Sequence, residues 1–388
     1  MDDSTIRPYR IDIPQADLDE LRFRLQRTRW AQEIEGTGWD FGVPVGRVRA
    51  LVDRWLDGWD WRRLETRLNQ FPQATTTIDG QNVHFLHIRS PEPDALPVVM
   101  THGWPGSIAE FLDVVEPLTN PRAFGADPGT AITLVVPSLP GSGFSGPTSE
   151  RGWGPARIAA AWVELMRRLG YERYGVAGND WGSIIAPYIG VAAPDRVAGI
   201  HVTQIFDAPS ETQLTELDAA DPEEAAAGGG LRWFLANMSA YDAVQSQQPQ
   251  SIAHALADSP AGLLAWHLII YRDWADTDFI LDNVSIHWLT GTVASAMRIY
   301  RERALEVRSA IAAGRIPTGI PGSEPTHIPV GLAQFANDTH AIRRFADRLH
   351  ANIVSWNSYD VGGHFAARQA PELLVADMRE FFVRVRRP

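Results

Sequence analysis

The sequence predicts an α/β protein with a mostly parallel, doubly wound sheet, interrupted by a helical insertion and preceded by an N-terminal segment. Apolar runs at Val98–Met100 and Ile132–Val136 have the composition of strands that are buried on both faces. They alternate with a helical pattern at Ile158–Leu169, and this alternation favours a parallel sheet. The stretch 208–325 then becomes helical and rich in Ala and Trp before strand texture returns. We therefore expect one sheet built from two separated parts of the chain.

The first 90 or so residues lack the texture of an α/β core. Leucines recur at helical spacing from Leu18 to Leu25, which predicts an amphipathic helix. A second helix is expected at Val48–Trp55. The runs TTTI and NVHFLH on either side of Asp79 and Gly80 predict a β-hairpin. This segment is expected to wrap around the rest of the protein.

The remaining core elements follow in order along the chain. Strands are expected at Tyr174–Ala177, Val197–Ile205, Ile328–Phe335 and Asn352–Trp356, with a closing helix at Pro371–Val383. The boundaries give an N-terminal region (1–90), a first core part (91–207), an insertion (208–325) and a second core part (326–388). Inside the insertion, Gly228–Gly230 and Pro317–Pro325 are expected to break helices.

Composition excludes several classes of function. Hydrophobic residues make up 45% of the 388 residues and charged residues 21%, a balance that supports a sizeable buried core. The net charge of −12 argues against a nucleic-acid or anionic-membrane partner. The absence of cysteine excludes disulfides, thiol catalysis and Cys-ligated metals. The start has no basic region followed by an apolar run, and no apolar run approaches the ~18 residues of a membrane span. We therefore expect a cytoplasmic protein.

The segment Gly178–Gly182, which reads GNDWG, is the most informative stretch of the chain. It lies between a predicted strand and the apolar start of a helix, the context of a nucleophile elbow. Its central residue is Asp180, where esterases carry serine. A carboxylate attacks an electrophilic carbon without first losing a proton, and the ester that forms can be cleaved by water. The elbow therefore indicates epoxide or carbon–halogen hydrolysis.

The run Thr101–Pro105, which reads THGWP, follows the first core strand. In α/β-hydrolases this position supplies one backbone donor of the oxyanion hole, and the residue after the nucleophile supplies the other. The expected donors are the amides of Trp104 and Trp181. His102 is expected to be a structural hydrogen-bonding residue.

A base and its orienting carboxylate are expected after the last two strands. His364 lies in the glycine-rich sequence GGHF, where hydrolases of this fold carry their histidine. Asp338 follows the strand Ile328–Phe335 and is the expected orienting carboxylate. Its charge would fix the tautomer of His364 and support the protonated ring. Asp360 is a competitor, but its closeness to His364 favours a loop-capping role.

Epoxide opening also needs an acid, because the leaving alkoxide is strongly basic. A tyrosine stays protonated at neutral pH and can donate its proton. The insertion holds three tyrosines, Tyr241, Tyr271 and Tyr300.

Over nearly its full length the sequence resembles the microsomal-type epoxide hydrolases, a family with the α/β-hydrolase fold. The matching motifs are TRW (28–30), GTGWDFGVP (36–44), DGWDWR (57–62), LNQFPQ (68–73), HGWPGS (102–107), GNDWGS (178–183) and GGHFAA (362–367). WLTGTVASAMRIYRE places Tyr300 at one acid tyrosine of the family, and SAYDAVQSQQP places Tyr241 at the other by a weaker match. The sequence departs from the family at FANDTH, where Asp338 stands in place of the usual glutamate and is shorter by one methylene.

The resemblance implies a helical cap and a two-step reaction that produces a vicinal diol. Asp180 would form an ester while Tyr241 and Tyr300 protonate the epoxide oxygen, and water activated by His364 would then cleave that ester. No metal or organic cofactor is required, and the only partner implied is a small-molecule epoxide, without nucleic acid or membrane. The sequence is compatible with a homodimer and leaves the oligomeric state open.

Tryptophans favour an aromatic or bulky apolar epoxide. Trp104, Trp181, Trp233 and Trp266 are the expected substrate contacts, and Trp274 and Trp288 also lie in the insertion. Soluble members of this branch resemble tailoring enzymes of enediyne-antibiotic pathways, which implies a biosynthetic role.

Two alternatives remain at this point. A haloalkane dehalogenase also uses an aspartate elbow followed by tryptophan, but it needs halide donors in place of the tyrosine pair. A non-catalytic binding protein on a hydrolase scaffold is disfavoured by the intact candidates for nucleophile, base and oxyanion hole.

Overall fold

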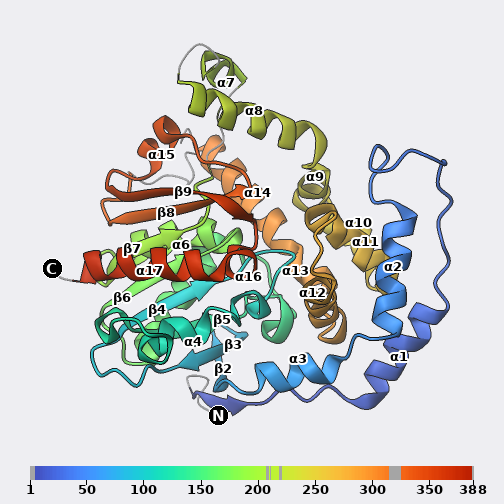
Figure 1. Ribbon diagram of the computed structural model, residues 1–388, viewed down its shortest axis with the longest axis horizontal. Coiled ribbons are helices and arrows are strands. Elements are labelled where there is room, and N and C mark those ends of the chain that lie inside the picture. The colour runs from blue at the N-terminus through green and yellow to red at the C-terminus, as the bar shows by residue number, and fades with distance from the viewer. Residues whose placement is uncertain (1–4, 207–208, 210, 218–220, 314–324, 387–388) are drawn as a thin grey trace.

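The protein is built on a nine-stranded sheet (Figure 1), here described from a computed structural model for residues 5–206, 209, 211–217, 221–313 and 325–386. The strands are β1 (Arg7–Tyr9), β2 (Gln73–Ile78), β3 (Gln81–Ile88), β4 (Leu96–Thr101), β5 (Ile132–Pro137), β6 (Tyr174–Gly178), β7 (Val197–Val202), β8 (Val330–Asn337) and β9 (Ile353–Gly363). Their order in the sheet is β1-β2-β3-β5-β4-β6-β7-β8-β9. Pairing is antiparallel from β1 to β5 and parallel from β5 to β9. The predicted fold class is confirmed.

Both faces of the parallel part are covered, as the unbroken apolar runs predicted. β5, β6 and β7 are buried along their whole length. Val99 packs in one hydrophobic cluster with α5 (Pro155–Arg168) and α6 (Trp181–Ala192). Its neighbour Val98 packs in a second cluster with α17 (Pro371–Arg386). Successive side chains of a strand point to opposite faces, so the two clusters lie on opposite sides of the sheet.

Shorter elements connect the core strands or follow the last one. They are α4 (Val115–Thr119), α15 (Arg343–Leu349) and α16 (Ala366–Gln369), with 3-10 helices η1 (Ile108–Phe111), η2 (Pro121–Phe124), η3 (Pro128–Thr130) and η4 (Gly143–Ser145). η1 follows the run that begins at Thr101 and carries the Trp104 amide, which we call the oxyanion segment, and α16 follows His364, the expected base.

The insertion is helical and forms a cap at one edge of the molecule (Figure 1). Its helices are α7 (Glu211–Leu217), α8 (Pro222–Asn237), α9 (Ala240–Gln247), α10 (Pro249–Leu256), α11 (Pro260–Tyr271), α12 (Thr277–Leu289), α13 (Val293–Ala296) and α14 (Arg298–Ala312). The predicted break at Gly228–Gly230 is wrong, because α8 runs through these glycines. Each glycine costs about 1 kcal/mol in a helix, but Asp221 caps the helix and Gly228 packs against Leu217. Pro317–Pro325 lies almost wholly outside the described residues.

The N-terminal segment contributes to two layers of the molecule. The predicted hairpin is present as β2 and β3, and β3 pairs with β5, so the first 90 residues supply three strands to the central sheet. This contradicts the expectation that they lie outside the core. The predicted helices are α1 (Gln15–Gln26) and α2 (Val45–Leu56), and α3 (Trp61–Leu68) was not predicted. These strands belong to the sheet because β3 pairs antiparallel with β5 at the edge of the parallel part.

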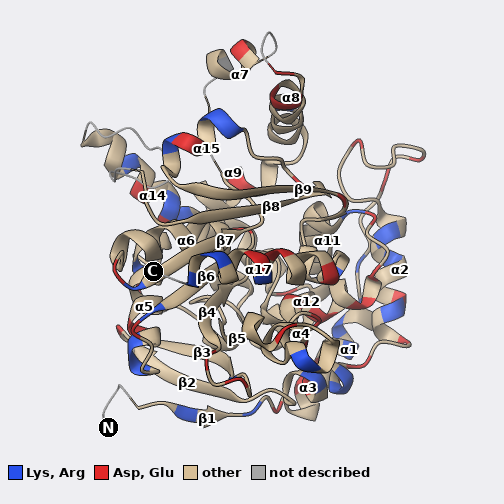
Figure 2. Cartoon of the chain, turned by 60° about the vertical axis from the view of Figure 1, so that its left-hand side comes forward, with Lys and Arg blue, Asp and Glu red and all other residues tan. Residues whose placement is uncertain are grey.

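Helices α1 to α3 lie along the outer side of the cap (Figure 1). Arg54 and Arg63 both bond Asp278 at the start of α12, and Trp59 Nε1 donates to Asp282 Oδ1 at 2.8 Å. The basic segments of this region and the acidic segments of α12 are visible in Figure 2. The sequence contains no lysine, so each basic partner is an arginine, which can bond a carboxylate through two N–H groups. None of the helices in the described ranges is long and apolar enough to span a membrane.

Candidate active site

Asp180 lies on the sharp turn between β6 and α6, with φ +52° and ψ −115°. A non-glycine residue in this region is strained and must be held by its surroundings. The turn also needs its two flanking glycines. A Cβ atom on Gly182 would lie 1.9 Å from the Thr101 carbonyl oxygen, and one on Gly178 would lie 2.2 Å from the Gly182 carbonyl carbon. This is the geometry of a nucleophile elbow.

Two backbone amides hold the Asp180 carboxylate. The Trp104 amide donates to Asp180 Oδ1 at 2.8 Å, and the Trp181 amide also bonds the carboxylate. Burial raises the pKa of Asp180, while His364 and these two amides oppose the rise. The two amides predicted for an oxyanion hole thus both bond the Asp180 carboxylate. Both nitrogens of His102 are bonded, to Gly103 O and the Leu139 amide, as expected of a structural residue.

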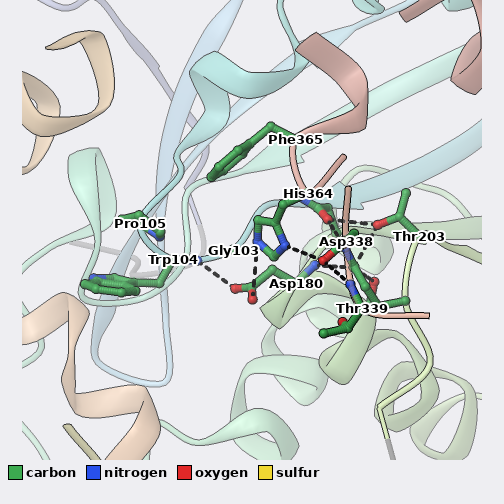
Figure 3. A network of polar contacts seen from close by, with 12 residues as sticks. Gly103, Trp104, Pro105, Asp180, Thr203, Asp338, Thr339, His364 and Phe365 are labelled. Atoms are coloured by element: carbon green, nitrogen blue, oxygen red, sulfur yellow. Dashed lines mark hydrogen bonds and ion pairs between the residues drawn. The ribbon is translucent and has the colours of Figure 1, made fainter. Parts of the chain in front are cut away.

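His364 lies between two aspartates (Figure 3). Its Nδ1 is 3.2 Å from Asp338 Oδ1, and its Nε2 is 3.7 Å from Asp180 Oδ2. Burial alone would lower the pKa of His364, but Asp338, Asp180 and Glu110 outweigh it and raise the pKa to about 9. The second distance is too long for a direct hydrogen bond, so Nε2 faces Asp180 and has no hydrogen-bond partner among the described residues.

Asp338, and not Asp360, is the carboxylate that bonds His364. Burial would raise the pKa of Asp338, but His364, the Gln204 amide and the Thr339 backbone amide lower it below its ordinary value. Asp360 is exposed and lies within β9, which extends beyond the predicted Asn352–Trp356. The expected loop-capping role of Asp360 is therefore wrong.

Gln204 was not identified from the sequence, although it bonds both Asp180 and Asp338. Its Oε1 accepts from the Asp180 amide at 2.8 Å, and its Nε2 donates to Asp338 Oδ2 at 2.5 Å and to Asn179 Oδ1 at 2.9 Å. A signal was available: Thr203 and Gln204 are polar residues that directly follow a buried strand, where α/β sheets gather functional groups.

Glu110 was also missed. It lies on η1, is 1% exposed, and its Oε1 accepts from Nδ2 of Asn179, the residue before Asp180, at 3.2 Å. Burial raises the pKa of Glu110 to about 8, so the carboxyl group is mostly protonated at neutral pH. The available signal was an acid among apolar residues directly after the oxyanion segment.

The cap places Tyr241 on α9 and Tyr300 on α14 beside the oxyanion tryptophans. Tyr241 stacks on Trp104 with ring centroids 5.4 Å apart, and Tyr300 meets Trp181 edge-on at 4.7 Å. The two tyrosine rings are 5.9 Å apart. Burial raises the pKa of both tyrosines far above the ordinary value, so both keep their protons. Tyr271 lies apart from this pair and donates its hydroxyl to Pro105 O at 3.2 Å.

The other tryptophans are spread over the cap. Trp233 is 54% exposed on α8, and Trp266 donates its indole N–H to Gln245. Trp274 stacks on Phe365, one residue from His364, whereas Trp288 packs beneath the Arg24 guanidinium. Of the expected substrate contacts, Trp104 and Trp181 are the two that stand beside Asp180 in the described structure. Within the described ranges, no cluster of three or more His, Asp or Glu side chains is arranged to hold a metal ion.

Comparison with known proteins adds sequence and structural relatives. Residues 6–111 match the model of the epoxide hydrolase N terminus, and residues 97–252 match the alpha/beta hydrolase fold. A putative epoxide hydrolase of Stigmatella aurantiaca is 39% identical, over 98% of this chain and 86% of that protein. Juvenile hormone epoxide hydrolase 1 of Ctenocephalides felis is 30% identical, over 97% and 85%.

Two solved structures superpose along almost the whole chain. The juvenile hormone epoxide hydrolase of Bombyx mori has a TM-score of 0.86 at 26% identity, covering 98% of this chain and 95% of that one. The epoxide hydrolase of Aspergillus niger has a TM-score of 0.83 at 31% identity, covering 98% and 97%.

Proposed function

Because the chain belongs to the epoxide hydrolase family and is an epoxide hydrolase, we propose that it converts a bulky or aromatic epoxide to a vicinal diol through a covalent ester of Asp180. The observation that carries the proposal is the placement of Asp180 between the Trp104 amide at 2.8 Å and His364 Nε2 at 3.7 Å. The tyrosine pair beside it supports an epoxide over a carbon–halogen substrate, because a halide leaving group needs no proton.

In the first half-reaction, an Asp180 carboxylate oxygen bonds an epoxide carbon and the carbon–oxygen bond of the ring breaks. The electron pair goes to the epoxide oxygen, which takes a proton from Tyr241 or Tyr300. The products are a hydroxyalkyl ester and a tyrosinate. Asp180 has then lost its charge, so one of the carboxyl groups that raise the pKa of His364 no longer does so. The imidazolium can therefore return a proton to the tyrosinate and become a base.

In the second half-reaction, His364 takes a proton from water and the hydroxide adds to the ester carbonyl carbon. The amides of Trp104 and Trp181 stabilise the resulting oxyanion. Collapse breaks the acyl carbon–oxygen bond, and the departing alkoxide takes the proton of the new carboxyl group. The diol leaves with Asp180 again a carboxylate and His364 again an imidazolium, which its pKa of about 9 favours at neutral pH.

Substrate trapping tests the ester. In His364→Gln the second half-reaction loses its base, whereas the ionised Asp180 can still attack. Mixing this variant with styrene oxide should give an adduct equal in mass to protein plus substrate, on the peptide that contains Asp180. Asp180→Asn is the matched control and should give no adduct. An His364→Gln protein that stays unmodified while the wild type makes diol would contradict the proposal.

Isotope transfer gives an independent readout. One turnover of the wild type in heavy-oxygen water should place the label in Asp180, because water attacks the ester carbonyl and the diol takes its second oxygen from the carboxylate. Label in the diol of that first turnover, with none in Asp180, would mean that water opens the ring directly.

The substrate class has its own test. The tyrosine pair packs on the rings of the two tryptophans whose amides bond Asp180, so aryl epoxides should react faster than propylene oxide. The reverse order would contradict an aromatic pocket. A cytoplasmic location, a homodimer and a role in enediyne-type biosynthesis stay predictions from the sequence.

A further inference from the structure

The turn between α11 and α12, residues Tyr271–Asp276, contains a second strained residue. Arg272 has φ +46° and ψ −124°, close to the values of Asp180 on the nucleophile elbow. A bulky side chain adopts this conformation only where neighbouring groups enforce it. Because Arg272 is not a catalytic candidate, its strain points to a turn whose shape is set from outside.

The N-terminal segment supplies the outer contacts. Arg47 on α2 donates from Nε to Arg272 O at 3.3 Å and from Nη2 to Trp274 O at 2.7 Å. Trp39 donates its indole N–H to Asp273 Oδ2 at 2.8 Å, and the Arg272 guanidinium lies 4.3 Å from the centre of the Trp39 ring. Arg47 and Trp39 thus bond three consecutive residues of the turn.

The inner side of the turn reaches the oxyanion segment. Tyr271 donates its hydroxyl to Pro105 O at 3.2 Å, and Pro105 follows Trp104, whose amide holds Asp180. Two contacts from α12 continue this support on the next two residues. His287 donates to Gly106 O at 3.3 Å, and Asn283 accepts from Ser107 Oγ at 2.6 Å. The segment that carries the Trp104 amide is therefore bonded to the cap at three successive residues.

The same turn packs against the loop of the base. The rings of Tyr271 and Trp274 stack on Phe365 with centroids 5.0 Å and 5.5 Å apart, and Phe365 follows His364. Arg368, four residues after His364, donates to Asp276 Oδ2 at 2.7 Å. One turn of the cap thus contacts both the segment that carries the Trp104 amide and the residues that follow His364.

We propose that the turn Tyr271–Asp276, held in shape by Arg47, positions the oxyanion hole and the base, so that Arg47 and Tyr271 are positioning residues for ester hydrolysis. This inference rests on the proposed two-step reaction. The oxyanion forms during ester hydrolysis, whereas alkylation depends on the ionised Asp180 and the tyrosine pair. A displaced Trp104 amide therefore slows the second step more than the first.

The test compares the two half-reactions in single-turnover experiments with styrene oxide, by quenching in acid and measuring protein ester and diol by mass. Arg47→Ala and Tyr271→Phe should each slow ester hydrolysis about 10-fold, a fraction of the loss from removing an oxyanion donor. Alkylation should change by less than about 3-fold, and the ester should accumulate. Tyr271→Phe removes only the hydroxyl and keeps the stack on Phe365, so it tests the contact even if Arg47→Ala fails to fold.

Two further variants separate positioning from general stability. Arg54→Ala also removes an N-terminal arginine that bonds the cap, but its partner is the side chain of Asp278 and not the turn. It should leave both rates within about 2-fold, because the pair is partly exposed. Arg47→Lys can bond one of the two carbonyls and should recover part of the lost hydrolysis rate.

The outcomes are distinct. An unchanged rate of ester hydrolysis in folded Arg47→Ala or in Tyr271→Phe would overturn the inference. It would also be overturned if Arg54→Ala slowed ester hydrolysis as much as Arg47→Ala does. If neither the wild type nor His364→Gln yields an Asp180 ester under the same conditions, the proposed function itself fails.

Discussion

Three carboxyl groups surround the imidazole of His364, and burial and bonding give them different protonation states. Asp338 accepts from three donors, which keep its pKa below the ordinary value despite burial. Burial dominates at Glu110 and raises its pKa to about 8. Burial also raises the pKa of Asp180, but the cation of His364 and two amides oppose the rise. Their surroundings thus suit these three carboxyl groups to the proposed roles of Asp338 as orienting anion and Asp180 as nucleophile, with Glu110 as a neutral acid.

Glu110→Gln should make stability less dependent on pH. A carboxyl group whose folded pKa lies above its unfolded pKa stabilises the protein fully below the unfolded value, and that contribution is lost as pH rises to about 8. Glutamine resembles the protonated acid and does not titrate. The melting temperature of the variant relative to the wild type should therefore rise between pH 5 and pH 9, on the order of 5 °C. Differential scanning calorimetry would measure this difference in melting temperature. A difference that stays constant from pH 5 to pH 9 would mean that Glu110 is charged in the folded protein.

Asp338→Asn should slow ester hydrolysis by roughly 10³-fold, because the amide cannot support the imidazolium and favours the wrong tautomer. Alkylation should persist, so the Asp180 ester should accumulate in rapid-quench experiments. Asp360→Asn is the control and should match the wild type, since Asp360 is exposed on β9. If Asp338→Asn had no effect while Asp360→Asn slowed ester hydrolysis severely, Asp360 and not Asp338 would be the carboxylate that orients His364.

Tyr300→Phe should slow alkylation about 10-fold, because it removes one acid and keeps the ring against Trp181. Adding Tyr241→Phe should bring the loss to about 10³-fold if both hydroxyl groups serve one oxygen. Single-turnover consumption of the epoxide measures this step. A double variant that still alkylates at the wild-type rate would require another proton donor.

At the scale of helices and strands, the elements with strong local rules were predictable. The elbow carries a steric demand that only glycine satisfies at Gly178 and Gly182, so its motif is visible in the sequence. The core strands were visible because burial on both faces leaves an unbroken apolar run. The role expected of Asp338 followed from its place after a strand, and its side chain does face His364.

Other features depend on contacts that no local pattern records. α8 continues through three glycines because capping and packing outweigh their cost. The side chain of Gln204 bonds the Asp180 amide, 24 residues away, and that of Glu110 bonds Asn179, 69 residues away. Trp233 was expected at the substrate and is 54% exposed, since composition cannot tell which face of a helix turns inward.

Gly182→Ala should disrupt the elbow. The added Cβ atom would lie 1.9 Å from the Thr101 carbonyl oxygen, and backbone on both sides leaves no flexible side chain to move away. The free energy of unfolding should fall by about 3 kcal/mol or more, as measured by urea denaturation, with loss of activity. Gly229→Ala is the matched control, because nothing lies near its Cβ position, and it should be neutral or stabilising. A Gly182→Ala protein of unchanged stability and activity would mean that the turn is not closely packed.

At the scale of the whole molecule, the N-terminal segment is part of the hydrophobic core. Five of the large side chains that its helices bury in the two main clusters are Leu51, Trp55, Trp61, Leu64 and Leu68. At roughly 2 kcal/mol each, their burial contributes about 10 kcal/mol. That sum is comparable with the total stability of a typical folded protein, about 5–15 kcal/mol.

Deleting residues 1–72 should therefore abolish cooperative unfolding. The remaining chain would expose the apolar surfaces of the cap and of β3, and should aggregate or lose its near-UV circular dichroism. A shortened protein that unfolds in a sharp thermal transition and still hydrolyses epoxides would show that folding and activity do not need the segment.

The contacts of Arg47 and Trp39 join positions 225 and 234 residues apart, and this separation orders the events of protein synthesis. The N-terminal helices leave the ribosome first, and the cap residues that Arg47 and Trp39 bond are translated 225 and 234 residues later. At about 5–20 residues per second, α2 waits roughly 10–50 s for the turn that it holds. During that interval its apolar face is open to the chaperones and proteases of the cell. The enzyme thus cannot close its active site until most of the polypeptide has been made.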